Sequence, residues 1–376
     1  MKVVMGEASN FRSPAPVGSH AYARAFASAG HDVLWIGTPL NPATFVRHPG
    51  HVDVKWRTHV WRRGGVRGDV EEYYPLTLLP VLDAPVLRSS FAINNTLRWT
   101  VPRIESIARR RGFGRPDLLW LSQSRFALPL LDVIPARKTA YRMSDDWGEF
   151  RGVPHSLVRA EETVVDRVDA VFVTSRILQE KVRRRRDDVV YLPNAAAECF
   201  FDDDAAEPAL VAGLRRPRVV FVGTLSYWVD VGVIRAIARA IPDADVLLVG
   251  PVETPLDDLP GNVHTLGAQP QGVLPGLLRH CDAAIIPFVP SELTQAVNPV
   301  KLFEYLATGV PVVASRLREM ESVASPALLC DGTDDFVAAV SGVLDSTIPW
   351  DADAARRFAR AHTWQKRFET VMQVLS

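Results

Sequence analysis

Short apolar runs alternate with amphipathic segments along most of the chain, which predicts strands and helices in alternation. In the first half, residues 18–30 form one such amphipathic helix. The strands predicted there are 2–6, 31–37, 117–123, 138–144 and 170–175. This alternation is typical of parallel sheets that are covered by helices on both faces.

A second series begins after residues 189–213, which have the composition of a domain connector. A helix is predicted near 229–240, and the pattern is helical again from about Trp350. The strands of this series are predicted at 217–226 with its following loop, 244–252, 262–267, 282–288, 310–315 and 327–330. At 376 residues the chain exceeds one comfortable hydrophobic core. We therefore predict an α/β protein with two Rossmann-like, doubly wound parallel-sheet domains that face a cleft.

The predicted domains are an N-terminal domain at 1–195, a C-terminal domain at 196–350, and C-terminal helices at 351–376 that pack back toward the first domain. Residues 70–104 do not follow the alternating rhythm. This segment is rich in proline, aromatic and aliphatic residues, so we interpret it as an insertion that could line a hydrophobic surface.

Composition is ordinary for a soluble globular protein, with 47% hydrophobic and 23% charged residues. The sequence contains no apolar run of the roughly 18 residues that a spanning helix needs, and its first residues lack a signal-peptide pattern. The three cysteines show no metal-ligand spacing, and we expect no bound metal. These features predict a cytoplasmic protein.

Charge is distributed unevenly, although the formal net charge is zero. Residues 1–190 hold 29 basic and 20 acidic side chains, and the remainder holds 14 and 23. Basic residues are interleaved with apolar ones in the front half, as in the segment 94–104, which suits anionic headgroups at the inner face of the membrane. The alternative is an ordinary arginine-rich surface, because only six of the 43 basic residues are lysine. A nucleic-acid partner is not expected at neutral overall charge.

Ligands of doubly wound sheets lie beyond the carboxyl ends of the strands, so candidate chemistry is sought there. Gly223 ends the first strand of the second series and precedes a predicted helix. A glycine lets the backbone approach a ligand, and a helix start offers free N–H groups to an anion. We therefore assign Gly223, Thr224 and Leu225 to a donor site, although glycines in such turns also serve packing alone.

Residues 298–315, "NPVKLFEYLATGVPVVAS", extend this site. Lys301 and Glu304 share one face at the start of a predicted helix, so Lys301 can neutralise a diphosphate while Glu304 accepts hydrogen bonds from ribose hydroxyls. The alternative is a plain intrahelical ion pair, worth a few tenths of a kcal/mol. The remaining donor-site candidates are Phe288, Asn298, Pro299 and Val300.

Several segments together resemble a known family. "FVGTLSYWVD", "VLLVGPV", "NVHTLG", "DAAIIPF" and "NPVKLFEYLATGVPVVAS" follow the order and spacing of the C-terminal domain of GT-B glycosyltransferases. The resemblance covers roughly residues 170–345, and the front half by topology. It is nearest to bacterial cell-surface polysaccharide transferases of family 4, of the teichuronic-acid type, and to the related xanthan glucuronosyltransferase.

This resemblance implies transfer of a sugar from a nucleotide-diphosphate sugar, with UDP favoured because similar enzymes often use it, and without a catalytic metal or other cofactor. Retaining members of family 4 generally carry two glutamates with seven residues between them. Glu304 matches the second, but the first position is Ala296. The glycine of the usual linker motif is Ala195. We therefore predict inverting chemistry.

Inverting transfer needs a base that deprotonates the acceptor hydroxyl. Asp145 and Asp146 follow a predicted strand and precede Trp147, a face on which a sugar can stack, and the related transferases carry a similar Asp-Asp-Trp stretch. At most one of the pair is the base, and the alternative is that one aspartate caps the following turn. His20 is the second candidate base. The acceptor-binding candidates are Glu7, Gln123, Arg125 and Trp147.

The chain is thus predicted to be a hexosyltransferase that acts on a lipid-linked, glycolipid, glycan or natural-product acceptor. A sugar-nucleotide 2-epimerase of the same architecture is an alternative, as is a non-catalytic sugar-binding protein. The apolar segment 70–104 argues against the epimerase, because that enzyme needs no acceptor surface. The pair Lys301 and Glu304 argues against the binding protein.

Overall fold

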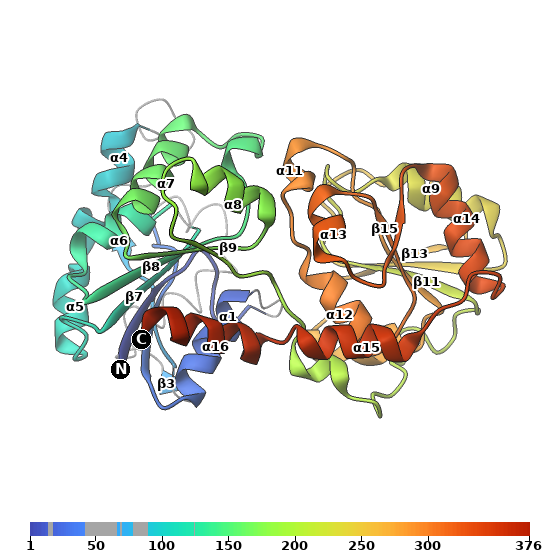
Figure 1. Cartoon of the computed structure of the whole chain (residues 1–376), viewed down its shortest axis with the longest axis horizontal. Helices are drawn as coiled ribbons and strands as arrows, with labels where there is room; N and C mark the ends of the chain where they lie inside the picture. Colours follow the sequence, from blue (N-terminus) through green and yellow to red (C-terminus); the bar gives the residue numbers. More distant parts are fainter. Residues whose placement is uncertain (14–17, 42–65, 68–69, 78–88, 124) are drawn as a thin grey trace. The chain divides into compact units, whose positions relative to one another are not determined.

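The computed structural model describes residues 1–13, 18–41, 66–67, 70–77, 89–123 and 125–376. These residues form two compact units, shown in Figure 1. The first consists of Met1–Leu192 together with Phe368–Ser376, and the second of Pro193–Arg367.

The first unit is built on a sheet of eight strands within its described residues, in the order β10-β9-β8-β7-β1-β2-β4-β3. The bounds are β1 (Lys2–Gly6), β2 (Asp32–Ile36), β3 (Val66–Arg67), β4 (Val70–Tyr73), β7 (Leu118–Ser122), β8 (Lys138–Met143), β9 (Ala170–Val173) and β10 (Val189–Tyr191). Neighbouring strands are parallel except for β3, which is antiparallel to β4. The order of the sheet reverses between β1 and β7, which is where a doubly wound sheet binds ligands.

Helices cover both faces of this sheet. Successive residues of a strand point to opposite faces, so on β7 Leu119 and Leu121 join an aliphatic core while Trp120 faces the other side. The aliphatic side packs under α5 (Ile104–Arg110), α6 (Ala127–Val133), α7 (His155–Arg167) and α8 (Arg176–Arg183), with α4 (Ser90–Asn95) against α6 and α7.

The opposite side is aromatic and is covered by α1 (Gly18–Ser28) and by the end of α16 (Trp364–Leu375). The Trp120 ring lies 5.4 Å from Phe172 and 6.0 Å from Phe26. Phe26 in turn meets Phe368 edge to face at 5.0 Å. The last helix is therefore held to the first unit by ring packing, and Lys138 Nζ donates to the carbonyl of Leu375 at 2.6 Å.

The second unit has six strands in its sheet, all parallel, among the residues described. The order is β13 (Val263–Gly267), β12 (Asp245–Val249), β11 (Arg218–Val222), β14 (Ala283–Ile286), β15 (Val312–Ser315) and β16 (Leu328–Cys330). This is the Rossmann order 3-2-1-4-5-6, whose switch point lies between β11 and β14.

Two helix layers cover the second sheet. In one, α9 (Val231–Ala240) packs against α14 (Thr333–Leu344); in the other, α12 (Val300–Thr308) packs against α10 (Leu274–Arg279) and α15 (Ala352–Ala361). The shorter helices of this unit are α11 (Glu292–Gln295) and α13 (Arg318–Val323). Gly309, at φ 82°, ends α12 in the left-handed conformation that glycine adopts without strain.

Two sequence predictions are corrected here. Residues 70–73, assigned to an insertion, form the parallel strand β4 beside β2, and residues 189–191, assigned to the connector, form the edge strand β10. The two glutamates of β4 obscured its strand pattern, because Glu72 is fully buried through its ion pair with Arg12. Residues 78–88 of the predicted insertion lie outside the described residues. Among the described helices, none combines the length and the apolar character needed to cross a membrane.

Candidate functional site

The carboxyl end of β11 opens the candidate site of the second unit. Gly223 follows this strand at φ 146°, where a side chain would be strained, and an added Cβ would lie 2.5 Å from Lys301 Nζ. The glycine is therefore needed both for its backbone conformation and for the close approach of the lysine. Its N–H donates to Val249 O at 2.7 Å, which holds the turn to the neighbouring strand.

Lys301 reaches this glycine from the first turn of α12. Its ammonium lies 4.2 Å from the centre of the Phe221 ring and 5.1 Å from that of Phe288. No side chain caps the helix, whose N-cap position is Pro299. The switch point of this sheet thus combines an ammonium group with an uncapped helix N-terminus, which together favour an anion.

Burial perturbs the ionisation of both charged residues of this helix turn. Removal from water lowers the pKa of Lys301 to about 7, although the charge of Glu304 opposes the shift. Burial likewise raises the pKa of Glu304 to about 7, against a hydrogen bond from Gln271 and the charge of Lys301. An anionic ligand beside Lys301 would favour the charged ammonium form that burial disfavours.

The loop before α12 is anchored through Asn298, which is buried. Its Oδ1 accepts from the Asn194 backbone N–H at 2.9 Å, and its Nδ2 donates to Glu319 at 2.8 Å. Asn298 therefore positions the loop, whereas sequence reasoning assigned it to the donor. Sequence reasoning did not find Glu319 or Gln271, because neither belongs to a local pattern that indicates the contact.

The other donor-site candidates lie on the same loops. Thr224 and Leu225 follow Gly223, and Leu225 is buried with its N–H bonded to Pro251 O at 2.8 Å. Val300 begins α12 and is half-buried. Tyr305, one turn further along, accepts from the Val222 N–H at 2.7 Å and so ties α12 to the end of β11. Ala296 is buried and brings only a methyl group.

In the first unit, the switch point between β1 and β7 holds a buried carboxyl group. Glu7 is 2% exposed, and Ser122 at the end of β7 donates to it at 2.8 Å. Burial raises the pKa of Glu7 to about 7, against hydrogen bonds from Ser19 and Ser122 and the positive charge of Arg142. Glu7 was predicted to bind the acceptor, but its burial and its serine partners make it a support within the protein.

Gln123, the other candidate of this strand end, clamps three elements together. Its Nε2 donates to Asp145 O and to Glu161 on α7, both at 2.8 Å. Its Oε1 accepts from Ser144 Oγ at 3.1 Å and from the Asp145 N–H at 2.9 Å. Because the amide uses both its donors and its acceptor in this way, Gln123 positions Asp145 and has no group left for an acceptor.

The two adjacent aspartates have different environments. Asp146 Oδ1 accepts from the Gly148 N–H at 2.9 Å, capping the short helix η3 (Trp147–Glu149), and pairs with Lys181 at 2.6 Å. Asp145 is half-buried and follows Ser144, whose hydroxyl donates to Gln123. Its pKa is raised, chiefly by burial and also by the charge of Asp146, with Ser144 and Arg142 opposing. A raised pKa on a positioned carboxylate is what a general base requires.

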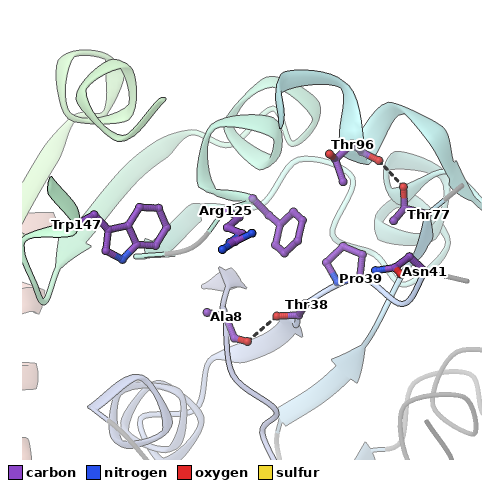
Figure 2. Close-up of a pocket in the computed structure, with 9 residues that line it drawn as sticks. Ala8, Thr38, Pro39, Asn41, Thr77, Thr96, Arg125 and Trp147 are labelled. Atoms are coloured by element: carbon purple, nitrogen blue, oxygen red, sulfur yellow. Dashed lines mark hydrogen bonds between the residues drawn. The ribbon is translucent and has the colours of Figure 1, made fainter. Parts of the chain in front are cut away.

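A cavity of about 350 Å³ in the first unit is lined by two of the acceptor candidates, Arg125 and Trp147, and Trp147 follows Asp146 in the sequence. In the view of Figure 2, Arg125 lies between Trp147 and the pair Thr77 and Thr96. Thr77 Oγ1 donates to Thr96 O at 2.8 Å there. An indole face and a guanidinium group beside a polar rim can bind a sugar and an anionic group.

The prediction of His20 as a candidate base is corrected by its surroundings. Its side chain is fully buried (0% exposed), its ring lies 5.0 Å from Trp35 and 5.8 Å from Phe11, and its Nε2 is 2.9 Å from the carbonyl of Asn10. An imidazole enclosed in this way packs the first helix against the sheet and does not reach an acceptor. Among the described residues, no group of three or more histidine, cysteine and acidic side chains is arranged to hold a metal ion.

The chain has two Rossmann-ordered units and the GT-B fold, and it is a glycosyltransferase. Residues 216–346, which lie within the second unit, match the family described as Glycosyl transferases group 1. This confirms the predicted fold class and enzyme class over the epimerase and binding-protein alternatives.

The particular relatives are similar at moderate or low identity. TuaH of Bacillus subtilis (strain 168), a glycosyltransferase assigned to teichuronic acid biosynthesis, is 27% identical over 304 residues, which cover 72% of this chain and 75% of that protein. Among solved structures, a sucrose-phosphate synthase from Thermosynechococcus elongatus has a TM-score of 0.71 at 14% identity, covering 100% of this chain and 98% of that one. Anabaena HepE in complex with UDP has a TM-score of 0.66 at 16% identity, covering 100% and 99%.

Proposed function

We propose that this glycosyltransferase moves a sugar from a UDP-sugar to a hydroxyl group of a lipid-linked or other glycan acceptor, with inversion at the anomeric carbon and without a metal ion. The second unit holds the nucleotide diphosphate, and the first unit holds the acceptor and the base. The observation that carries the proposal is the Lys301 ammonium, which lies at the uncapped start of α12 against the Gly223 backbone.

The donor assignment follows from matching chemistry to position. The diphosphate takes the positive end of α12 and the ammonium of Lys301, and binding restores the full charge of that lysine. Glu304, one turn along the same helix, accepts hydrogen bonds from the ribose hydroxyls. UDP is favoured because HepE, a structural neighbour, has been solved with UDP, with UDP and glucose, and with UDP-glucose. The acceptor class is suggested by TuaH, whose name places it in the biosynthesis of a cell-surface polymer.

Asp145 is the general base of the proposed reaction. It takes the proton of the acceptor hydroxyl while that oxygen forms a bond to the anomeric carbon, and the bond from this carbon to the diphosphate oxygen breaks. The leaving diphosphate keeps the electron pair, and its charge is neutralised by Lys301 and the helix N-terminus. Ala296 supports inversion, because its methyl group offers no carboxylate where retaining relatives have one.

The test is calorimetric titration of the full chain with UDP, GDP, ADP and dTDP, repeated on Lys301→Ala and Glu304→Ala. We expect UDP to bind and both variants to weaken its binding at least tenfold, since a charge-assisted hydrogen bond contributes about 1.5–3 kcal/mol. Glu321→Ala, which removes an exposed carboxylate of α13 in the same unit, is the matched control and should bind like wild type.

Two outcomes overturn the donor assignment: no diphosphate binds, or both variants bind UDP with unchanged affinity. Metal independence is tested separately by repeating the titration and a sugar-transfer assay in EDTA. Loss of transfer in EDTA, restored by adding Mg²⁺ or Mn²⁺, would contradict that part of the proposal.

A further inference from the structure

One surface of the first unit combines exposed aromatic side chains with arginines. It is formed by α4, the short helix η2 (Thr96–Trp99) and the strand β6 (Thr100–Val101), and we name it the α4–β6 surface. Among the described residues of this unit, the large hydrophobic side chains that are exposed are Met1, Phe91, Trp99, Val101 and Val374. Three of these five fall within eleven consecutive residues, with Phe91 69% and Trp99 53% exposed.

The burial pattern of residues 91–99 is that of one amphipathic helical stretch. Ala92, Ile93, Thr96 and Leu97 are buried. The positions that face outward are Phe91, Asn94, Asn95, Arg98 and Trp99, which follow the spacing i, i+3, i+4, i+7 and i+8 of a single helix face. The outer face of this stretch is therefore aromatic and cationic, whereas a face that meets only water is usually polar throughout.

Charge on this surface has one sign. Residues 89–104 contain two arginines, Arg98 and Arg103, both exposed, and no acidic residue. The following helix, α5, has one acidic residue, Glu105, in its first turn and ends with the exposed Arg109 and Arg110. An indole ring and a phenyl ring among guanidinium groups suit the headgroup region of a bilayer, where the rings enter the apolar boundary and the cations meet phosphates.

The α4–β6 surface also borders the candidate acceptor cavity. Thr96, which begins η2, lines that cavity, and so does Thr77, which donates to the Thr96 carbonyl. Thr77 lies on β5 (Leu76–Thr77), which pairs with β6. The same short helix therefore presents Trp99 to the outside and Thr96 to the cavity.

We propose that the α4–β6 surface docks the protein on an anionic membrane, with Phe91, Trp99 and Val101 entering the lipid boundary and Arg98 and Arg103 contacting anionic headgroups. The cavity, whose wall includes the buried Thr96 of η2, then lies next to the membrane that holds a lipid-linked acceptor, and this last step rests on the proposed function. A second copy of the chain is a poorer occupant, because a two-fold contact places the same surface, and hence like charges, on both sides.

Stable docking needs both an apolar and a basic contribution, because either one alone gives marginal membrane binding. The test is cosedimentation of the full chain with vesicles of phosphatidylcholine alone and of phosphatidylcholine with about one third phosphatidylglycerol, an anionic fraction large enough to attract basic segments. Wild type should bind the anionic vesicles and bind the neutral ones at least tenfold more weakly.

Two double variants remove the apolar and the basic contribution one at a time. Phe91→Ser with Trp99→Ser should lose about tenfold or more in binding to both vesicle types, because the apolar contribution is removed. Arg98→Gln with Arg103→Gln should lose about tenfold or more on anionic vesicles alone, at about 1 kcal/mol for each charge. The matched controls are Val374→Ser on α16 and Arg24→Gln on α1, both exposed positions on the opposite side of the sheet, and they should bind like wild type.

The docking proposal is overturned if the wild-type protein does not bind anionic vesicles, or if the control variants lose as much binding as the surface variants. It is also overturned if wild type self-associates in sedimentation velocity and only the surface variants stay monomeric without any vesicle binding. UDP titration and thermal melting of every variant separate this result from the proposed function. If the protein binds vesicles but no nucleotide, the donor site of the proposed function is contradicted and membrane docking is supported. If it binds UDP but no vesicles, only membrane docking is contradicted.

Discussion

The two units have the same sheet order around their switch points, but they fill those points in opposite ways. In the second unit the residue after the first strand is Gly223, which has no side chain, so that Lys301 approaches its backbone closely. In the first unit the residue after β1 is Glu7, whose carboxyl group is buried against Ser122 and Ser19. One switch point pairs a glycine with a lysine, and the other holds a carboxyl group within a polar network.

This difference limits which residues of the first unit can contact an acceptor. Because Glu7 and Gln123 are occupied within the protein, the groups left for an acceptor are those one step beyond them: Asp145, Arg125 and Trp147. The proposed function thus places the nucleotide against the backbone in one unit and the acceptor on a side-chain surface in the other. Four predictions test this comparison.

The largest effect should come from Asp145→Asn, which removes the proposed base. We expect kcat for sugar transfer to fall about 10³-fold, within the range typical of a lost general base, while UDP affinity is unchanged. Asp146→Asn is the matched control and should lose about tenfold or less, since Asp146 acts through its cap and its pair with Lys181. Equal losses in the two variants would reject the distinction between them.

The glycine at the switch point of the second unit is tested by Gly223→Ala. The new methyl group would meet Lys301 Nζ, and the backbone at φ 146° would be strained, so we expect UDP affinity to fall about 30-fold or more. Gly261→Ala, at a glycine with open space and no special backbone requirement, serves as the control in the same titration. Unchanged UDP affinity in Gly223→Ala would show that this switch point is not a contact surface.

The carboxyl group at the switch point of the first unit is tested by Glu7→Gln. Because the folded-state pKa of Glu7 is raised to about 7, the folded protein binds more protons than the unfolded chain between about pH 4.5 and 7, and stability falls as pH rises through that window. The variant should therefore have a higher free energy of unfolding at pH 8, by about 1–2 kcal/mol, and nearly the wild-type value at pH 5. Urea unfolding at both pH values measures this, with the exposed Glu149→Gln as control.

The smallest effect concerns the pH dependence of UDP binding. The pKa of Lys301 is lowered to about 7, so its protonated fraction, and with it UDP affinity, should fall about fivefold between pH 7 and pH 8. The raised pKa of Glu304 should weaken binding below pH 7, because a protonated carboxyl is a poorer acceptor for ribose hydroxyls. Lys301→Arg keeps its charge at every pH, so its UDP titrations should lose the alkaline decline.

Much of the fold was predictable because helices and strands leave short-range periodic patterns. Most strands of both sheets were expected within a few residues of their observed bounds, and a helix was expected to begin just before Lys301, where α12 starts. The strand β4 was missed for a physical reason. Its glutamates break the apolar pattern, and only the distant Arg12 makes Glu72 acceptable in the interior.

The candidate sites divide in the same way. The sequence by itself determined the two Rossmann-like series and the local pair Lys301 and Glu304 on one helix turn, because these features depend on residues a few positions apart. Only the tertiary structure gave Asp145 and Asp146 different environments, enclosed the His20 ring and engaged both ends of the Gln123 amide. Those outcomes depend on contacts between distant residues, such as Gln123 with Glu161 and Asp146 with Lys181, and no local pattern records which partners a fold will bring together.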